Sequence, residues 1–198
     1  MLDTVSSHDV ETRTRILEAS VRLLEEHRGQ SVRMGDIAKA AGISRQAVYL
    51  HFASRAELLE ATTLYLDEIL GLEQRLARSR SADSGTERLD AYIEFWGSYI
   101  PEIYGVAKAL LVAQDTDEAA AAAWNERMLA MRDGCRAAIE SLKSDGNFAE
   151  EWNTREATDF LWTMLSVRNW EQLTQECGWS SRKYIRWMQA VARRTFVK

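Results

Sequence analysis

The sequence predicts an all-α protein, and three observations support this fold class. Alanine, leucine, glutamate and arginine, which favour helices, are abundant. Pro101 is the one proline among 198 residues, so few positions oppose a helix. Apolar residues recur at intervals of three and four, which is typical of helices with one buried face. Since a chain of this length can bury roughly 70% of its unfolded surface, we expect it to fold without a disulfide or a metal.

Composition and charge narrow the class of protein. No apolar run approaches the roughly 20 residues that span a bilayer, and the first residues lack a basic and then apolar signal, so we expect a cytoplasmic protein without a membrane partner. Cys135 and Cys177 have no ligand spacing, and we expect both to be small buried side chains. Residues 12–55 hold eight Lys or Arg and four Asp or Glu, a net +4 in a chain of −5. This basic segment of an acidic protein can attract phosphate locally.

Periodicity and glycines predict the first helices. A helix is expected over 9–27, and Gly29 can end it. A short helix in MGDIAKAA is closed by Gly42, and a third helix, RQAVYLHF, runs toward a cap at Ser54. The apolar pattern from Ser54 through Leu76 then predicts one long helix. The buried stripe of the first helix is predicted to be Ile16, Ser20, Leu23, Leu24 and His27.

A polar segment, SRSADSG at 79–85, predicts a linker to a second helical region. Helices are expected there at 85–99, 101–114, 117–144, 154–177 and 180–196, separated by Pro101, Asp115, Gly146 and Gly178. Three helix starts have a capping residue three positions before a glutamate, namely Ser54 before Glu57, Ser84 before Glu87 and Asn153 before Glu156.

Residues 34–52 fit a helix-turn-helix, in which a short turn containing glycine separates two helices. Gly42 permits the turn, Ile43 points back to hold the two helices together, and Ser44 can cap the second helix. The small core of this unit is predicted to be Ile37, Ala38, Ala41, Val48 and Phe52. The second helix of such a unit enters the major groove, so this segment predicts a DNA-binding domain.

Exposed side chains of this unit suit DNA chemistry. Arg45 can pair bidentately with guanine and Gln46 with adenine, and both lie in the first turn of the reading helix. Arg33, Tyr49, His51 and Arg55 suit phosphates, which Arg55 could contact together with the amides of the following helix start. The alternatives are that Tyr49 and His51 cover the core and that Arg45 is solvated. The predicted DNA-binding set is Arg33, Ser44, Arg45, Gln46, Tyr49, His51 and Arg55.

Two segments, RILEASVRLLEE and GDIAKAAGISRQAVYLHFASRAELLEA, resemble the DNA-binding head of the tetracycline-repressor (TetR) family of bacterial regulators over about residues 11–62. The resemblance implies an all-helical homodimer whose C-terminal domain binds a small molecule and forms the dimer interface. Ligand binding in that family usually releases the DNA. By position, the resemblance assigns Tyr49 and His51 to phosphate and Arg45 and Gln46 to variable base reading.

The chain departs from the family pattern at three positions. Arg33 stands where a Ser or Thr cap is usual, Gly35 lies inside a helix, and Arg55 replaces a commoner lysine. None of these changes removes the motif. The expected organisation is a three-helix DNA-binding domain with a helix-turn-helix over 1–53, joined by a long helix to a helical effector-binding and dimerisation domain within 54–198.

Aromatic residues dominate the second region. Seven tryptophans exceed what a small helical core requires, and large rings with flexible methionines are typical of an apolar cavity wall. We therefore predict a hydrophobic or aromatic effector, although core packing is the alternative explanation. Glu94, Glu102 and Asp115 could instead favour a cation, or be solvated. The predicted ligand contacts are Phe95, Trp96, Tyr99, Leu110, Trp124, Met128, Trp162 and Leu165.

Two C-terminal helices suit a four-helix interface made of two helices from each subunit. An isologous dimer would place its two heads about 34–36 Å apart and recognise an inverted repeat. Residues 182–198 hold six Lys or Arg and no acid, which indicates a solvated helix face or a second DNA contact. The predicted interface residues are Phe160, Leu161, Met164, Tyr184, Met188, Val191 and Thr195.

An enzyme is the main competing class. All three histidines (His8, His27 and His51) precede the aromatic region, and the chain has no Gly-rich phosphate loop and no GxSxG motif, so we expect neither catalysis nor a cofactor. The sequence favours a repressor released by a small molecule. It leaves open an activator, or a DNA-binding regulator controlled by a protein partner.

Overall fold

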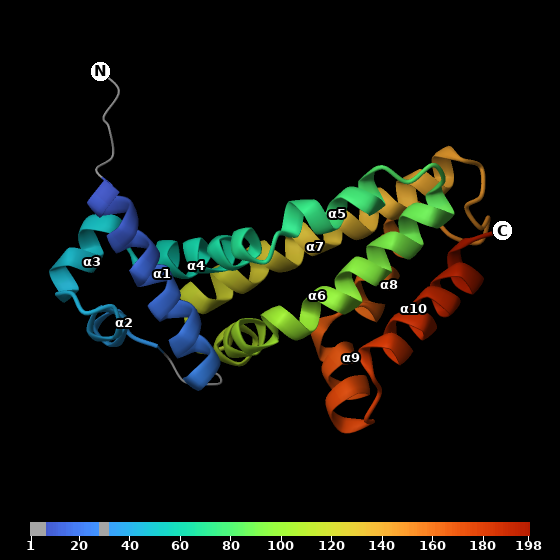
Figure 1. Cartoon of the computed structure of the whole chain (residues 1–198). Helices are drawn as coiled ribbons and strands as arrows, with labels where there is room; N and C mark the ends of the chain where they lie inside the picture. The colour runs from blue at the N-terminus through green and yellow to red at the C-terminus, as the bar shows by residue number, and fades with distance from the viewer. Residues whose placement is uncertain (1–6, 28–31) are drawn as a thin grey trace, which may run out of the picture. The chain divides into compact units, whose positions relative to one another are not determined.

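The computed structural model describes residues 7–27 and 32–198, and within these ranges the chain is helical. The described residues contain no β-strand, apart from one isolated bridge between Phe148 and Val197. The prediction of an all-α fold is therefore confirmed (Figure 1). The elements are α1 (Ser7–His27), α2 (Met34–Ala40), α3 (Arg45–His51), α4 (Arg55–Ile69), α5 (Leu72–Arg80), α6 (Gly85–Ala113), α7 (Glu118–Ser144), α8 (Thr154–Met164), α9 (Val167–Glu171), the π-helical η1 (Gln172–Glu176) and α10 (Ser181–Phe196).

The chain forms two compact units. Unit 1 comprises Met1–Ile69 and Gly105–Arg127, and unit 2 comprises Leu70–Tyr104 and Met128–Lys198. Helices α6 and α7 each contribute one part to each unit. This division reflects how the helices pack. The boundary predicted after residue 53 instead separates a DNA-binding from an effector-binding function, and it stays a prediction.

Helices α1 to α4 pack around the small apolar core expected for the helix-turn-helix. Helix α1 contacts α2 and α4, and α2 contacts α3. The five predicted core residues are all buried. Gly42 has a φ of 70°, and the Ile43 amide donates to the Ala38 carbonyl at 3.0 Å, which closes α2 as the turn requires. The predicted architecture of this unit is confirmed.

The stripe predicted for the first helix is correct except at its end. Ile16, Ser20 and Leu24 are buried, and Leu23 is half-buried. His27 is exposed, and its ring nitrogen Nδ1 lies 2.9 Å from the Leu23 carbonyl oxygen. Its side chain therefore satisfies the helix end rather than the core. Gly29, the predicted helix end, lies outside the described residues.

The single helix predicted from Ser54 through Leu76 is wrong. The chain leaves the helix after Ile69, and α5 restarts at Leu72 behind Gly71, whose φ is 68°. This left-handed conformation suits glycine, which lacks a Cβ. Because the apolar pattern continues across the break, periodicity alone concealed it.

The helix break predicted at Pro101 is also wrong, since α6 runs without interruption from Gly85 to Ala113. A proline inside a helix costs about 3 kcal/mol because it lacks an amide donor. Its neighbours Tyr99 and Ile100 are buried within unit 2. Burial of this face offsets the local cost, so tertiary packing overrides the propensity.

The helix predicted over 154–177 is divided into α8, α9 and η1. Helix α8 ends at Met164, and Ser166 caps α9 by accepting a hydrogen bond from the Asn169 amide at 3.2 Å. Trp96 donates its indole N–H to the Leu165 carbonyl at 2.7 Å, which satisfies the carbonyl at the break. Ser166 is a capping residue that is visible in the sequence, whereas Trp96, the partner on α6, is distant in the chain.

All three predicted helix starts are confirmed. Ser54 accepts from the Glu57 amide at 3.1 Å, Ser84 from the Glu87 amide at 3.2 Å, and Asn153 from the Glu156 amide at 2.9 Å. At α4 the glutamate also accepts from the Ala53 amide, which completes a reciprocal cap.

The two cysteines differ in burial. Cys135 is buried as predicted, but Cys177 is exposed, because it follows η1 at the chain turn before Gly178. Among the described helices, none combines the length and apolar composition that a bilayer span requires.

Candidate functional site

Helix α3 presents the predicted base-reading residues on the surface of unit 1. Ser44 caps the helix, and its Oγ accepts from the Ala47 amide at 3.1 Å. Val48 and Phe52 are fully buried, so they fix one face of α3 against the core. Arg45 and Gln46 are exposed in the first turn. The local sequence therefore positions both polar side chains on a helix anchored from behind.

Arg45 and Tyr49 are neighbours on α3. The Arg45 Nη2 donates to the Tyr49 hydroxyl at 3.3 Å, and the guanidinium carbon lies 5.6 Å from the centre of the Tyr49 ring. The tyrosine is 41% exposed, so it does not merely cover the small core. His51, at the end of α3, is half-buried. Arg45 and Tyr49, four positions apart, therefore share one exposed polar edge of α3, whereas His51, two positions after Tyr49, lies on another side of the helix.

Arg33 precedes α2 as its N-cap residue, and it is exposed. Its backbone amide donates to the Asp36 carboxylate at 3.2 Å, so the backbone and not the arginine side chain makes this capping contact. Arg33 replaces the usual Ser or Thr without loss of the helix start. Its contact with phosphate stays a prediction.

Arg55, the first residue of α4, has two partners inside unit 1. Its Nε donates to the Val32 carbonyl at 2.7 Å, and its Nη1 donates to the Asp117 carboxylate at 2.6 Å. The side chains of Arg55 and Asp117 are 21% and 14% exposed. Asp117 also accepts from the Ala119 and Ala120 amides at the start of α7. That Arg55 contacts phosphate stays a prediction. Its ion pair with Asp117 was not predicted from the sequence.

A second ion pair joins α4 to α7 within unit 1. Arg127 on α7 pairs with Asp67 near the end of α4, and its Nε lies 2.6 Å from the Glu126 carboxylate. The charges are reversed relative to the first pair, since here the acid lies on α4. Both ends of α4 are thus tied to the start or the middle of α7.

Most of the predicted ligand residues lie in unit 2, and five of the eight are buried. Phe95 and Tyr99 stack with ring centres 5.3 Å apart, and Trp96 donates to Leu165 as described above. Trp124, Met128 and Trp162 are half-buried. Leu110 and Trp124 belong to unit 1. Each buried ring already has neighbours, which is what core packing also predicts, so the ligand role stays a prediction.

Cys135 has no reactive character in this core. Burial raises the pKa of its thiol to about 12, so the thiolate is not formed at neutral pH. The adjacent Tyr92 donates to the Met131 carbonyl at 2.9 Å, and burial raises the pKa of its hydroxyl well above the usual value. Both groups are structural parts of unit 2.

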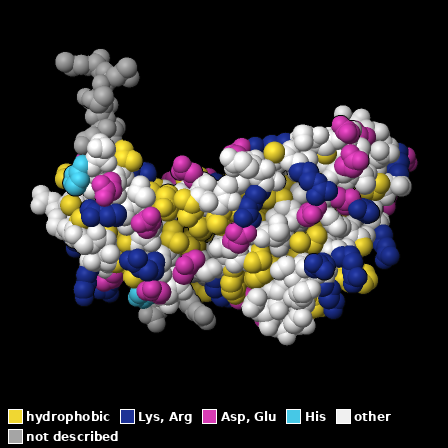
Figure 2. Space-filling model, in the orientation of Figure 1, with side chains coloured by type: hydrophobic (Ala, Val, Ile, Leu, Met, Phe, Trp, Pro, Cys, Tyr) yellow, Lys and Arg dark blue, Asp and Glu magenta, His cyan; other side chains and the backbone are white. Residues whose placement is uncertain are grey.

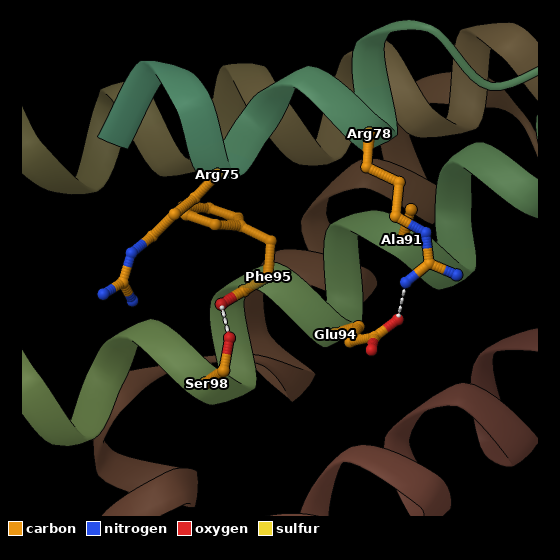
Figure 3. A pocket seen from close by; sticks show the side chains of 6 residues that line it. All are labelled: Arg75, Arg78, Ala91, Glu94, Phe95 and Ser98. Atoms are coloured by element: carbon orange, nitrogen blue, oxygen red, sulfur yellow. Dashed lines mark hydrogen bonds and ion pairs between the residues drawn. The ribbon is translucent and has the colours of Figure 1, made fainter. Parts of the chain in front are cut away.

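A cavity of about 300 Å³ lies between α5 and α6 of unit 2 (Figure 3). The Phe95 ring lines it, beside Ala91 and Ser98. Arg75 and Arg78 reach it from α5. Arg78 pairs with Glu94 at 2.5 Å, and Arg75 makes a bidentate pair with Glu102 at 2.6 and 2.9 Å. Of the predicted ligand residues, Phe95 alone lines this cavity.

The predicted interface residues divide into two groups. Leu161, Tyr184 and Met188 are buried within their own protomer. Phe160 is 46% exposed and Val191 is 36% exposed. Met164 and Thr195 are half-buried. The buried side chains belong to the core of unit 2, and the exposed ones are free to contact another surface.

Sequence reasoning missed three features of these surfaces. Trp187 on α10 is 39% exposed and was not assigned to the interface. Its place opposite the buried stripe of α10 was readable from periodicity. The arginines at the α5–α6 cavity and the Asp117 partner of Arg55 depend on contacts between distant segments, which no local pattern predicts.

The basic C-terminal stretch is exposed, which both a solvated helix face and a second DNA contact require. Its six Lys and Arg residues are all exposed, and Figure 2 shows basic side chains over α10. Arg193 pairs with Asp90 on α6, and Lys198 pairs with Glu150 at 2.9 Å. Two of the six cations thus have ion-pair partners within unit 2, and Lys183 and Arg186 lie over the rings of Trp179 and Trp187.

The arrangement in unit 1 defines a helix-turn-helix of the DNA-binding class, and comparisons with known proteins agree. Residues 16–62 match the model for bacterial regulatory proteins of the tetR family. The resemblance to the TetR family is therefore confirmed over this segment. The transcriptional regulator UidR of Escherichia coli strain K12 is 34% identical over 112 residues, which are 57% of this chain and 54% of UidR. The chain thus spans about half the length of the curated relatives that it matches.

Solved structures with the same fold cover almost the whole chain. A transcriptional regulator from Saccharomonospora viridis, solved in complex with choline, has a TM-score of 0.74 at 20% identity and covers 96% of this chain and 99% of its own. FadR from Bacillus subtilis, solved with stearoyl-CoA, has a TM-score of 0.70 at 15% identity and covers 91% and 95%. At these identities the likeness establishes the fold. The two ligands differ greatly in chemistry, so the fold does not specify an effector.

Proposed function

We propose that the protein is a DNA-binding transcriptional regulator that acts as a repressor and is released from an inverted-repeat operator by a hydrophobic or aromatic small molecule. The observation that carries the DNA-binding part is the exposed polar edge of α3, in which Arg45, Gln46 and Tyr49 stand on a helix fixed from behind by Val48 and Phe52. The first turn of a reading helix is the part that reaches base edges.

Within this proposal the residues have two roles. Arg45 and Gln46 read base edges, because their planar groups can form paired hydrogen bonds. Tyr49, His51 and Arg33 contact phosphate and position the helix. The match to the family over residues 16–62, which includes all of α3, supports a DNA-binding role for this helix.

The direct test is a selection of bound fragments from the genomic DNA of the source organism, followed by titration of the recovered site over a range of salt concentrations. A dimeric regulator recovers an inverted repeat, and its affinity falls steeply with salt because phosphate contacts release counterions. Recovery of random fragments from a folded, ligand-free preparation would contradict the proposal.

The effector part of the proposal rests on the aromatic residues of unit 2 and on the cavity beside Phe95. The Trp96 ring centre lies 6.4 Å from that of Phe95, so a ligand that contacts Phe95 in this cavity should alter tryptophan emission. A set of small aromatic and acyl compounds should therefore include some that change intrinsic fluorescence saturably and weaken operator binding in the same concentration range. If compounds change neither signal, control by a protein partner becomes the favoured alternative.

We also propose a homodimer that uses α8 and α10. Phe160, Val191 and Trp187 are exposed apolar residues on these two helices, and large exposed apolar side chains favour an interaction surface. Val191→Glu should produce monomers in sedimentation and weak operator binding, because a half-site contact alone is weak. Leu129→Glu, at an exposed leucine on α7, is the matched control and should leave the dimer intact. An unchanged dimer for Val191→Glu would exclude this interface.

A further inference from the structure

Arg55 forms an ion pair with Asp117, and the same guanidinium is predicted to contact a DNA phosphate. Arg55 lies four residues after His51, the last residue of α3, so its Cα lies within about 14 Å of the end of the predicted DNA-reading helix. Its guanidinium nevertheless bonds inward, to the Val32 carbonyl and the Asp117 carboxylate. We infer that Asp117 competes with a DNA phosphate for Arg55 and thereby sets how tightly the head binds DNA. This inference rests on the proposed DNA-binding function.

The contacts around Asp117 lower the free-energy cost of moving Arg55 from Asp117 to a DNA phosphate. When Arg55 leaves, Asp117 Oδ1 keeps its hydrogen bonds from the Ala119 and Ala120 amides, at 3.1 and 3.2 Å. A buried carboxylate left without donors would carry a large penalty, but this one stays satisfied. Asp117 is therefore a cap for α7 that can release its cation without leaving an orphaned charge.

The Arg55 guanidinium is also accessible to a DNA phosphate. Arg55 is 21% exposed, so the pair is not sealed from solvent. Among the described contacts its Nη2 makes no hydrogen bond, whereas a phosphate offers two oxygens to the planar fork. DNA also presents a dense row of phosphates, so the anion concentration at the head is high once the protein has docked.

The structure offers a matched control in the second ion pair of α4. Asp67 pairs with Arg127 in the same compact unit, but Asp67 lies twelve positions after Arg55, near the other end of α4. Asp67→Asn changes the net charge by the same amount as Asp117→Asn. It therefore separates the general effect of a lost negative charge from the specific release of Arg55.

The experiment measures binding of a short random-sequence duplex by fluorescence anisotropy over a salt series. Asparagine at position 117 still caps α7, so Asp117→Asn should fold normally. It should bind DNA about tenfold more tightly at low salt, and the slope of log affinity against log salt should steepen by about 0.9, the value for one added phosphate contact. Asp67→Asn should change the slope little.

A double-mutant cycle with Arg55→Gln assigns the effect to the pair. Without the guanidinium, Asp117→Asn should have no effect beyond that of Asp67→Asn. Asp117→Ser, which also keeps a cap, should repeat the result if the asparagine variant proves unstable. An equal gain for both aspartate variants, or a gain that persists with Arg55→Gln, would overturn the inference. If wild-type protein fails to bind any duplex, the proposed function itself is wrong.

Discussion

The helix-turn-helix of unit 1 and the aromatic core of unit 2 differ in where their structural information lies. In the helix-turn-helix, the turn at Gly42, the cap at Ser44 and the core at Val48 are specified within a few residues of one another. In unit 2, the decisive contacts join distant segments, such as Trp96 to Leu165. A short unit with local contacts can be inferred residue by residue, whereas a core assembled from long helices depends on packing. Each prediction below tests one side of this contrast.

The largest effect is expected at Gly85, at the start of α6. A Cβ there would lie 2.6 Å from the Leu142 Cα, and backbone of α7 cannot move aside easily. The Gly85 amide also donates to Asp145. Gly85→Ala should lower the free energy of unfolding by about 3 kcal/mol, because the two helices must separate. Chemical denaturation measures this loss, and a change below about 1 kcal/mol would show that the close approach is not required.

The next effect concerns the indole bond that holds the α8–α9 break. Trp96→Phe removes the donor to the Leu165 carbonyl and leaves that buried acceptor unsatisfied. We expect a loss of about 2 kcal/mol in thermal or chemical unfolding. Trp187→Phe, at an exposed tryptophan, is the control and should change stability by less than about 0.5 kcal/mol. Equal losses for the two variants would mean that the bond contributes nothing.

On the helix-turn-helix side, Tyr49→Phe removes a hydroxyl and leaves the fold unchanged. Tyr49 is 41% exposed, so unfolding should be unaffected. Binding should weaken by about 1 kcal/mol for every operator alike, because a phosphate contact carries no sequence information. Titration of several operator variants tests this. A loss that depends on the operator sequence would assign Tyr49 to base reading.

The smallest effect is expected at Gly35 in α2. A Cβ at this position meets no atom within 4 Å, in contrast to Gly85. Gly35→Ala should raise the free energy of unfolding by about 0.5–1 kcal/mol, since alanine restricts the unfolded chain more than glycine does. A destabilised variant in denaturant titration would show that α2 has a tighter environment than its backbone indicates.

The outcomes of the sequence predictions follow the same contrast. The all-α class, the turn at Gly42 and the three helix caps were predicted correctly, because capping and turn residues act within a few positions. The uninterrupted helix through Pro101 was not, because packing against other elements decides whether a helix continues, and the break at Gly71 was not, because the apolar pattern continues across it. The partner of Arg55 could not be predicted at all, since Asp117 is 62 residues away along the chain.

The candidate sites show the same limit. The exposed edge of α3 was predicted from the core residues that fix the opposite face of the helix. In α10, periodicity predicted an apolar stripe but not the surface that it contacts, and Tyr184 and Met188 are buried in their own protomer. A helix with apolar residues on two sides does not reveal which side faces the core.

The most direct test of the central claim, that α3 reads DNA sequence, is a parallel selection of operators with wild-type protein and with Arg45→Ala. Arg45 is exposed at the first turn and is not part of the core, so the variant should fold normally. The account predicts that the variant recovers the same inverted repeat with relaxed preference at one position in each half-site. Unchanged preference at every position, with uniformly weaker binding, would show that Arg45 only contacts the backbone and would contradict the account.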